Sequence, residues 1–206
     1  TSAREYLRNL HNSRQTIRDS LGAAGYRRYL HLILDSGTDR NRFIQELLQN
    51  ADDCVYPEGV VPTFILKQSG NTITTEYNER GFSRANIRAI TAIGESTKDD
   101  LLKQNDTIGK KGVGFKTIFA IASEVQIHSG DYHFRLKDHS PTIPDLLRGY
   151  EGKRENGTKM VITTKGERGG AVLDRSSMLQ MCLCLLRLRS ISIDSHEMTI
   201  TDTETE

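Results

Sequence analysis

The sequence predicts an α+β fold, an α/β two-layer sandwich in which helices cover one face of a mixed, mostly antiparallel sheet. Helical and strand-like segments follow one another without the regular alternation that is typical of a parallel sheet. Neighbouring β-rich runs are joined by short turns, which indicates hairpins. The 206 residues are 36% hydrophobic and 27% charged, as expected of a globular chain rather than a disordered one.

The first half of the chain predicts helices around one hairpin. Apolar residues recur at helical spacing up to about Ser36, with breaks expected at Gly22 and Gly25. Asp39 is a suitable cap for the next helix, which the run Pro57-Glu58-Gly59 would terminate. The turn at 68–70 separates two β-rich runs. The expected elements are helices over 1–36, 40–54 and 84–92 and strands over 63–67 and 71–77.

The second half predicts more strands. A polar segment over 94–106 has no clear period and indicates a loop or lid. Glycines open the next segment, 108–121, which continues as an apolar helix. A loop containing Pro141 and Pro144 is expected between later strands. The remaining predicted elements are strands over 124–128, 132–136 and 159–164, a helix over 176–188 and one alternating run over 190–201.

Composition excludes several classes of function. Lys and Arg number 28 against 27 Asp and Glu, so the net charge of +1 does not indicate a nucleic-acid partner. No apolar run approaches the roughly 18 residues that would indicate a membrane span, and the N-terminus lacks the apolar core of a secretory signal. Three Cys without metal-ligand spacing are expected to be reduced thiols. We therefore expect an intracellular protein, cytoplasmic or nuclear, with no membrane partner.

The chain is expected to comprise an N-terminal helical arm, residues 1–36, and a single domain over residues 37–206. The polar run at 203–206 looks like a cut within a longer sequence, so we expect this domain to be a fragment of a larger protein.

The helix predicted over 40–54 carries a polar face beside its apolar stripe. Glu46, Asn50 and Asp53 are spaced i, i+4 and i+7, which places them on one side of a helix. A solvated surface face would show the same pattern, so this helix alone does not establish a site.

A glycine-rich segment precedes the helix predicted near residue 115. Gly109, Gly112 and Gly114 would let backbone N–H groups approach an anion, and the start of a helix favours phosphate. The segment is not a Walker A loop because no Gly-Lys-Ser/Thr ends it, and no β-α-β unit brackets it as in a dinucleotide fingerprint.

Four motifs occur in an order and spacing that resemble those of the GHKL ATPases, the superfamily of gyrase B, heat-shock-protein-ninety chaperones, histidine kinases and MutL. They are ELLQNADD at 46–53, NERGF at 78–82, IGKKGVGF at 108–115 and NGTK at 156–159. GESTK at 94–98 and GKKGVGFK at 109–116 look most like the sacsin and No Vein type of this domain. The resemblance implies the Bergerat ATP-binding fold.

The resemblance also implies a role for individual residues. Asn50 would ligate Mg²⁺ and Glu46 would be the catalytic general base for the attacking water. Asp53 would form hydrogen bonds around the adenine or the lid, and Thr158 would help to hold water on the adenine side. The lid and the glycine segment would contribute further nucleotide-binding residues, which are Ser96, Thr97, Lys98, Gly109, Gly112, Val113, Gly114 and Phe115. Of these, Ser96, Thr97, Lys98 and the three glycines would contact phosphate.

One motif departs from the family. The first glycine box usually carries an Asp that accepts the adenine amino group, whereas alignment on Gly81 places Tyr77 there. Asn78 follows one residue later with a carbonyl oxygen, and Glu79 offers a carboxylate nearby. The residue that replaces the Asp stays open at this point.

The expected function is therefore an ATP-binding domain of a chaperone-like or regulatory protein, with ATP and Mg²⁺ as cofactors and slow hydrolysis. Nucleotide would act as a conformational switch read by other domains of the same protein or by protein clients. Two alternatives remain: a module that senses ATP or ADP without turnover, and a protein-interaction domain with a degenerate pocket.

Overall fold

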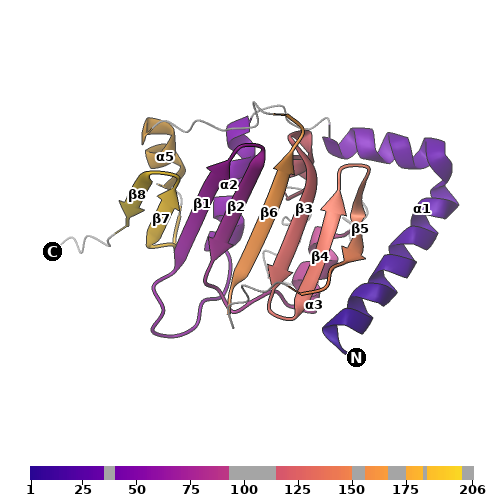
Figure 1. Cartoon of the computed structure of the whole chain (residues 1–206), viewed down its shortest axis with the longest axis horizontal. Helices are drawn as coiled ribbons and strands as arrows, with labels where there is room; N and C mark the ends of the chain where they lie inside the picture. Colours follow the sequence, from indigo (N-terminus) through magenta and orange to yellow (C-terminus); the bar gives the residue numbers. More distant parts are fainter. Residues whose placement is uncertain (35–39, 93–114, 150–155, 167–174, 183–184, 201–206) are drawn as a thin grey trace, which may run out of the picture.

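A computed structural model describes residues 1–34, 40–92, 115–149, 156–166, 175–182 and 185–200. Its centre is an eight-stranded sheet with the strand order β5-β4-β3-β6-β2-β1-β7-β8 (Figure 1). Strand β7 pairs with β1 in parallel, and all the remaining strand pairs are antiparallel. The predicted α+β class is confirmed. The strands are β1 (Thr63–Ser69), β2 (Thr72–Tyr77), β3 (Ala122–Ser129), β4 (Tyr132–Lys137), β5 (Ser140–Leu146), β6 (Thr158–Thr164), β7 (Ser190–Ile193) and β8 (His196–Thr199).

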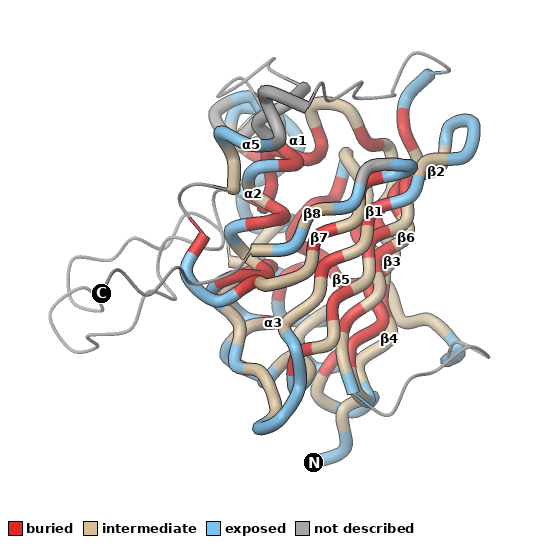
Figure 2. Tube along the Cα trace, turned by 90° about the vertical axis from the view of Figure 1, so that its left-hand side faces the viewer, coloured by how far each residue is buried: buried red, intermediate tan, exposed pale blue. Residues whose placement is uncertain are grey.

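Helices pack against one face of this sheet, as Figure 2 shows from the side. Side chains alternate between the two faces of each strand, so Phe64, Ile73 and Ile162 all point to the covered face and are buried. The apolar stripe of α2 and the short helix α3 meet them there and exclude water from a common core. The helical elements are α1 (Ala3–Leu34), α2 (Arg40–Asp52), α3 (Arg84–Ile90), the 3₁₀ turn η1 (Thr117–Ala120) and α5 (Arg175–Cys182).

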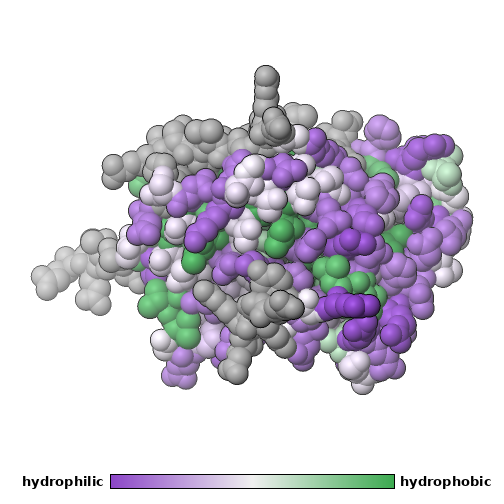
Figure 3. All heavy atoms as spheres, in the orientation of Figure 1, coloured by the Kyte–Doolittle hydropathy of each residue, from purple (hydrophilic) through white to green (hydrophobic). Residues whose placement is uncertain are grey.

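The opposite face of the sheet is largely hydrophilic (Figure 3). Oppositely charged side chains pair across it, for example Lys159 and Glu76 at 2.9 Å and Lys137 and Asp145 at 3.2 Å. These partly exposed pairs contribute little to the free energy of unfolding. The sheet thus has one apolar and one polar face. A slip by one residue would move polar side chains into the core, so the register of the strands is fixed.

The N-terminal arm is one long helical element with a kink. Gly22 has φ 65° and ψ 167°, outside the helical region, whereas the second break expected at Gly25 is absent from the described helix. His11 Nδ1 lies 3.0 Å from the carbonyl oxygen of Pro144 on the edge strand β5. Beyond the kink, the Tyr29 hydroxyl donates to the carbonyl of Ala92 at 3.4 Å. The division into residues 1–36 and 37–206 stays a prediction.

Three elements differ from the sequence-based expectation. The loop expected around Pro141 and Pro144 is the edge strand β5, which tolerates proline because it pairs only with β4. The single run expected over 190–201 is a hairpin that turns at Asp194, whose φ is 51°. The helix expected over 176–188 ends at Cys182, and residues 185–189 are not helical.

Two further predictions can be compared with the described part of the chain. Cys54 and Cys182 are free thiols, and Cys184 lies outside the described residues. Among the described helices, none combines the length and the apolar character that crossing a bilayer requires.

Candidate functional site

Helix α2 presents Asn50 to a small cavity on the helical side of the sheet. The cavity has a volume of about 20 Å³, room for about one water molecule. Its lining is mostly apolar and includes Tyr77 of β2, Phe82, Phe115 and Met160 of β6. The carboxamide of Asn50 is therefore a polar group set among aromatic and aliphatic side chains.

The other two residues predicted on α2 are placed differently. Glu46 is half-buried one turn before Asn50 and is not among the residues that line this cavity. Asp53 follows the last residue of the helix and is exposed, and its carbonyl oxygen accepts a hydrogen bond from Arg187 at 3.2 Å. The structure thus brings Asn50 to the cavity and leaves Asp53 at the surface.

Asn78 joins the end of β2 to the start of β1. Its Oδ1 accepts from the N–H of Thr63 at 2.8 Å, and its Nδ2 donates to the carbonyl of Val61 at 2.9 Å. Both ends of the carboxamide are engaged with backbone. Asn78 therefore fixes the loop that leads into the next residue, Glu79.

Glu79 is a buried carboxylate with only 2% of its surface exposed. One carboxylate oxygen accepts from the hydroxyl of Thr158 and the other from the N–H of Gly81. A buried carboxylate requires such donors, because loss of hydration is otherwise costly. The carboxylate of Glu79 thus joins Gly81 of its own motif to Thr158 of a separate one.

Ser129 of β3 extends this network. Its Oγ accepts from the N–H of Phe82 at 2.7 Å and lies 2.6 Å from the hydroxyl of Thr158. Since Thr158 uses its single hydrogen on Glu79, the hydrogen between the two hydroxyls belongs to Ser129. Ser129 therefore donates to Thr158, and Thr158 donates to Glu79. None of the sequence motifs pointed to Ser129.

Gly157 explains why Thr158 comes so close to the loop after β2. Its φ is +105°, and a Cβ at this position would lie 2.5 Å from the carbonyl oxygen of Tyr77. Only glycine avoids both the strained backbone and the steric clash. The register pairs Tyr77 with Thr158, so the loop that carries Glu79 passes directly beside the hydroxyl.

Phe115 and Lys116 begin the described part of the chain after the glycine-rich segment. Phe115 is buried and lines the cavity. Lys116 is also buried, and its Nζ donates to the carbonyl of Ala92 at 2.5 Å. Burial, and then the charge of Arg14, lower the pKa of the Lys116 ammonium group to about 8. Seven further predicted nucleotide-binding residues lie outside the described residues, namely Ser96, Thr97, Lys98, Gly109, Gly112, Val113 and Gly114.

Asp52 has a role that the motif spacing did not predict. Its buried carboxylate accepts three backbone hydrogen bonds, from the N–H groups of Leu186 at 2.9 Å, Arg187 at 2.7 Å and Leu188 at 2.8 Å. These bonds turn the chain after α5 against the end of α2, which explains why the predicted helix stops early. The partners lie more than 130 residues away in the sequence, so no local pattern reveals them.

Metal-ligating side chains form no cluster in the part of the chain that the structure describes. Within the described ranges, no three His, Cys, Asp or Glu side chains come together in a way that could hold a metal ion. An Asn oxygen is a hard ligand, suitable for Mg²⁺ when phosphate and water complete the coordination shell. Asn50 brings such an oxygen to the lining of the cavity.

The comparisons with known proteins identify one relationship. No protein-family model matches the chain. A segment of 98 residues is 46% identical to Protein NO VEIN of Arabidopsis thaliana, which corresponds to 47% of this chain and 3% of that protein. The chain is related to a region of NO VEIN. Because so little of NO VEIN is covered, the activity of the whole protein stays a matter of proposal.

Proposed function

We propose that this chain is a GHKL-type domain with a Bergerat fold that binds Mg-ATP as a conformational switch and hydrolyses it slowly. The contact between Glu79 and Thr158 supports this most strongly, because it joins the first glycine box to the distal Thr of the resemblance. In that family an Asp accepts the adenine amino group. Glu79 supplies the carboxylate here, one methylene longer.

The chemistry of Glu79 is suited to this task. A carboxylate has about four lone-pair positions, and the hydroxyl of Thr158 and the N–H of Gly81 occupy two of them. An exocyclic amino group, with two hydrogens to donate, is a suitable hydrogen-bond partner for a carboxylate. The apolar lining from Phe82, Phe115 and Met160 suits a flat aromatic base. Since the cavity is only about 20 Å³, binding must separate these side chains.

Asn50 and Glu46 would serve the phosphate end of the nucleotide. The Asn50 oxygen would be one ligand of Mg²⁺, with phosphate oxygens and water as the others. Glu46, one turn earlier on α2, would orient and deprotonate the attacking water, which is worth roughly 10²–10⁴-fold in rate. The glycine-rich residues and the lid remain predicted contributors.

The narrow cavity favours a second candidate, a protein-interaction domain whose nucleotide pocket is degenerate. A nucleotide sensor without turnover is the intermediate case. In each case the partners would be other domains of a larger protein or protein clients. These three functions differ in what the isolated domain does with nucleotide.

Calorimetric titration with ATP and ADP, with and without Mg²⁺, separates the functions. Mg²⁺-dependent binding that Asn50→Ala abolishes would support the nucleotide site. If neither nucleotide binds, the protein-interaction domain is the remaining candidate. Phosphate release then distinguishes the slow ATPase from the sensor. Glu46→Ala should retain binding and lose release, because a general base contacts water rather than nucleotide.

A further inference from the structure

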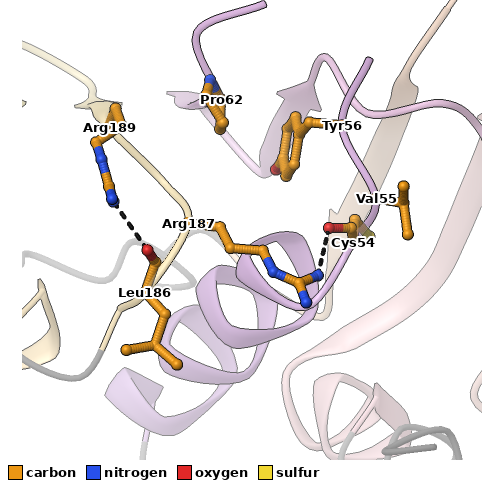
Figure 4. A pocket seen from close by; sticks show the side chains of 7 residues that line it. All are labelled: Cys54, Val55, Tyr56, Pro62, Leu186, Arg187 and Arg189. Carbon is orange, nitrogen blue, oxygen red and sulfur yellow. Dashed lines mark hydrogen bonds between the residues drawn. The ribbon is translucent and has the colours of Figure 1, made fainter. Parts of the chain in front are cut away.

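A second, larger pocket lies at the C-terminal end of α2, away from the cavity beside Asn50. It has a volume of about 480 Å³. Figure 4 shows that its walls come from the segment after α2, from Pro62 before β1 and from the segment that precedes β7. The lining residues are Cys54, Val55, Tyr56, Pro62, Leu186, Arg187 and Arg189.

Apolar side chains are unusually exposed at this pocket. Leu186 is 80% exposed and Val55 is 59% exposed. Val60 and Val61, in the loop that leads to Pro62, are 38% and 61% exposed. Of the six large apolar side chains that are exposed among the described residues, these are four. Single exposed apolar residues are ordinary, but such a concentration marks an interaction site.

The charged residues that line the pocket are both arginines. Arg187 Nη1 donates to the carbonyls of Asp53 at 3.2 Å and Cys54 at 2.9 Å. Arg189 Nη1 donates to the carbonyls of Leu186 at 3.0 Å and Leu188 at 3.1 Å. Figure 4 shows one of these bonds for each arginine. The backbone therefore holds both guanidinium groups in place, which lowers the entropy lost when they bind a carboxylate.

We propose that this pocket binds an acidic peptide segment that carries a large apolar side chain. The apolar side chain would enter the pocket that Val55 and Leu186 help to line, and flanking carboxylates would pair with Arg187 and Arg189. Charge complementarity selects this occupant, because a basic segment would meet two fixed cations at the pocket wall.

The pocket is connected to α2 by direct contacts. The carboxylate of Asp52 accepts hydrogen bonds from the N–H groups of Leu186 and Arg187. Cys54 lines both this pocket and the cavity beside Asn50, and its Sγ donates to the Asn50 carbonyl at 3.0 Å. A bound segment would therefore bias the helix that carries Asn50 and Glu46. This coupling rests on the proposed nucleotide function, whereas docking of the peptide does not.

The test uses three fluorescein-labelled peptides and the domain without nucleotide. One peptide has a leucine and a phenylalanine among aspartates and glutamates. A second replaces the acidic residues by lysine, and a third replaces the two apolar residues by serine. At low ionic strength, fluorescence anisotropy should detect binding of the first peptide below about 1 mM and at least about tenfold weaker binding of the other two. Amide NMR shifts should change at Val55, Leu186 and Arg187.

Variants locate the binding site. Leu186→Ser and Arg187→Gln should each weaken binding of the acidic peptide by about tenfold or more. Leu179→Ser, at a leucine 51% exposed on α5, and Arg148→Gln, at an exposed arginine after β5, are the matched controls and should bind like the parent. Leu186 is so exposed that its replacement leaves the core intact, which circular dichroism checks.

Several results would overturn the proposal. These are no binding of the acidic peptide up to about 1 mM, equal binding of the acidic and lysine peptides, or equal loss in the pocket and control variants. Sedimentation equilibrium that shows a dimer dissociated by Leu186→Ser would assign the pocket to a second copy of the chain instead.

Discussion

The hydroxyl of Thr158, the first residue of β6, donates a hydrogen bond to the buried carboxylate of Glu79 in the loop after β2. The two residues belong to motifs 79 positions apart in the sequence, and pairing of β2 with β6 brings them together. Glu79 is the residue that we propose in place of the Asp that the first glycine box lacks.

Thr158→Val tests the energetic weight of this contact. Valine keeps the shape of the side chain but removes the donor to Glu79 and the acceptor for Ser129. The free energy of unfolding should fall by about 1–3 kcal/mol, because a buried carboxylate loses a partner. Urea denaturation measures the change. Thr163→Val, on the opposite face of the same strand, is the control, and an equal loss in both variants would contradict the account.

Gly157→Ala tests the close approach of β6 to Tyr77. Alanine would place a methyl group 2.5 Å from the Tyr77 carbonyl oxygen at a positive φ. Gly70→Ala is the matched control, since its φ is +58° but nothing lies within 4 Å of the added Cβ. Gly70→Ala should cost about 1 kcal/mol and Gly157→Ala clearly more. Equal melting temperatures of the two variants would show that the start of β6 can move away from Tyr77 without loss of stability, which would contradict the account.

Asp52→Asn tests the anchor between α2 and the segment after α5. The amide retains one acceptor oxygen where the carboxylate uses two for three N–H groups. We expect a loss of about 2–3 kcal/mol in the free energy of unfolding, because these are hydrogen bonds to a charged group. Asp53→Asn, at the exposed neighbour, should change it by no more than about 0.5 kcal/mol. The prediction fails if the two variants unfold at the same urea concentration.

Lys116 makes stability depend on pH. Its pKa is lowered to about 8 in the folded protein, against about 10.4 in an unfolded chain. Between these values the unfolded state binds more protons, so the free energy of unfolding should rise as pH increases from about 8 to about 10. Lys116→Met should remove this rise while Lys165→Met, at an exposed lysine, keeps it. Parallel pH profiles of Lys116→Met and the parent would show that the buried ammonium group does not cause it.

Local patterns predicted most of the elements in this fold. The helix at 40–52 and the hairpin of β1 and β2 follow from periodicity and turn residues, which act over a few positions. Strand β5 was missed because its prolines disguise an edge strand, and the end of α5 because Asp52 acts from far away in the sequence. Motif spacing singled out Asn50, Glu79 and Thr158 as candidates. The contact of Glu79 with Thr158 and the backbone bonds of Asn78 could not be predicted, because they depend on the pairing of β2 with β6.

The measurement that tests the central claim most directly is calorimetric titration of Mg-ATP and Mg-GTP into the parent and Glu79→Gln. The parent should bind ATP more tightly than GTP, because the Glu79 carboxylate would accept from the adenine amino group and would repel the guanine oxygen. Glu79→Gln should reduce this preference by about tenfold to hundredfold, whereas Glu76→Gln, on the polar face of the sheet, should retain it. Binding of neither nucleotide by the parent, or an unchanged preference in Glu79→Gln, would contradict the account.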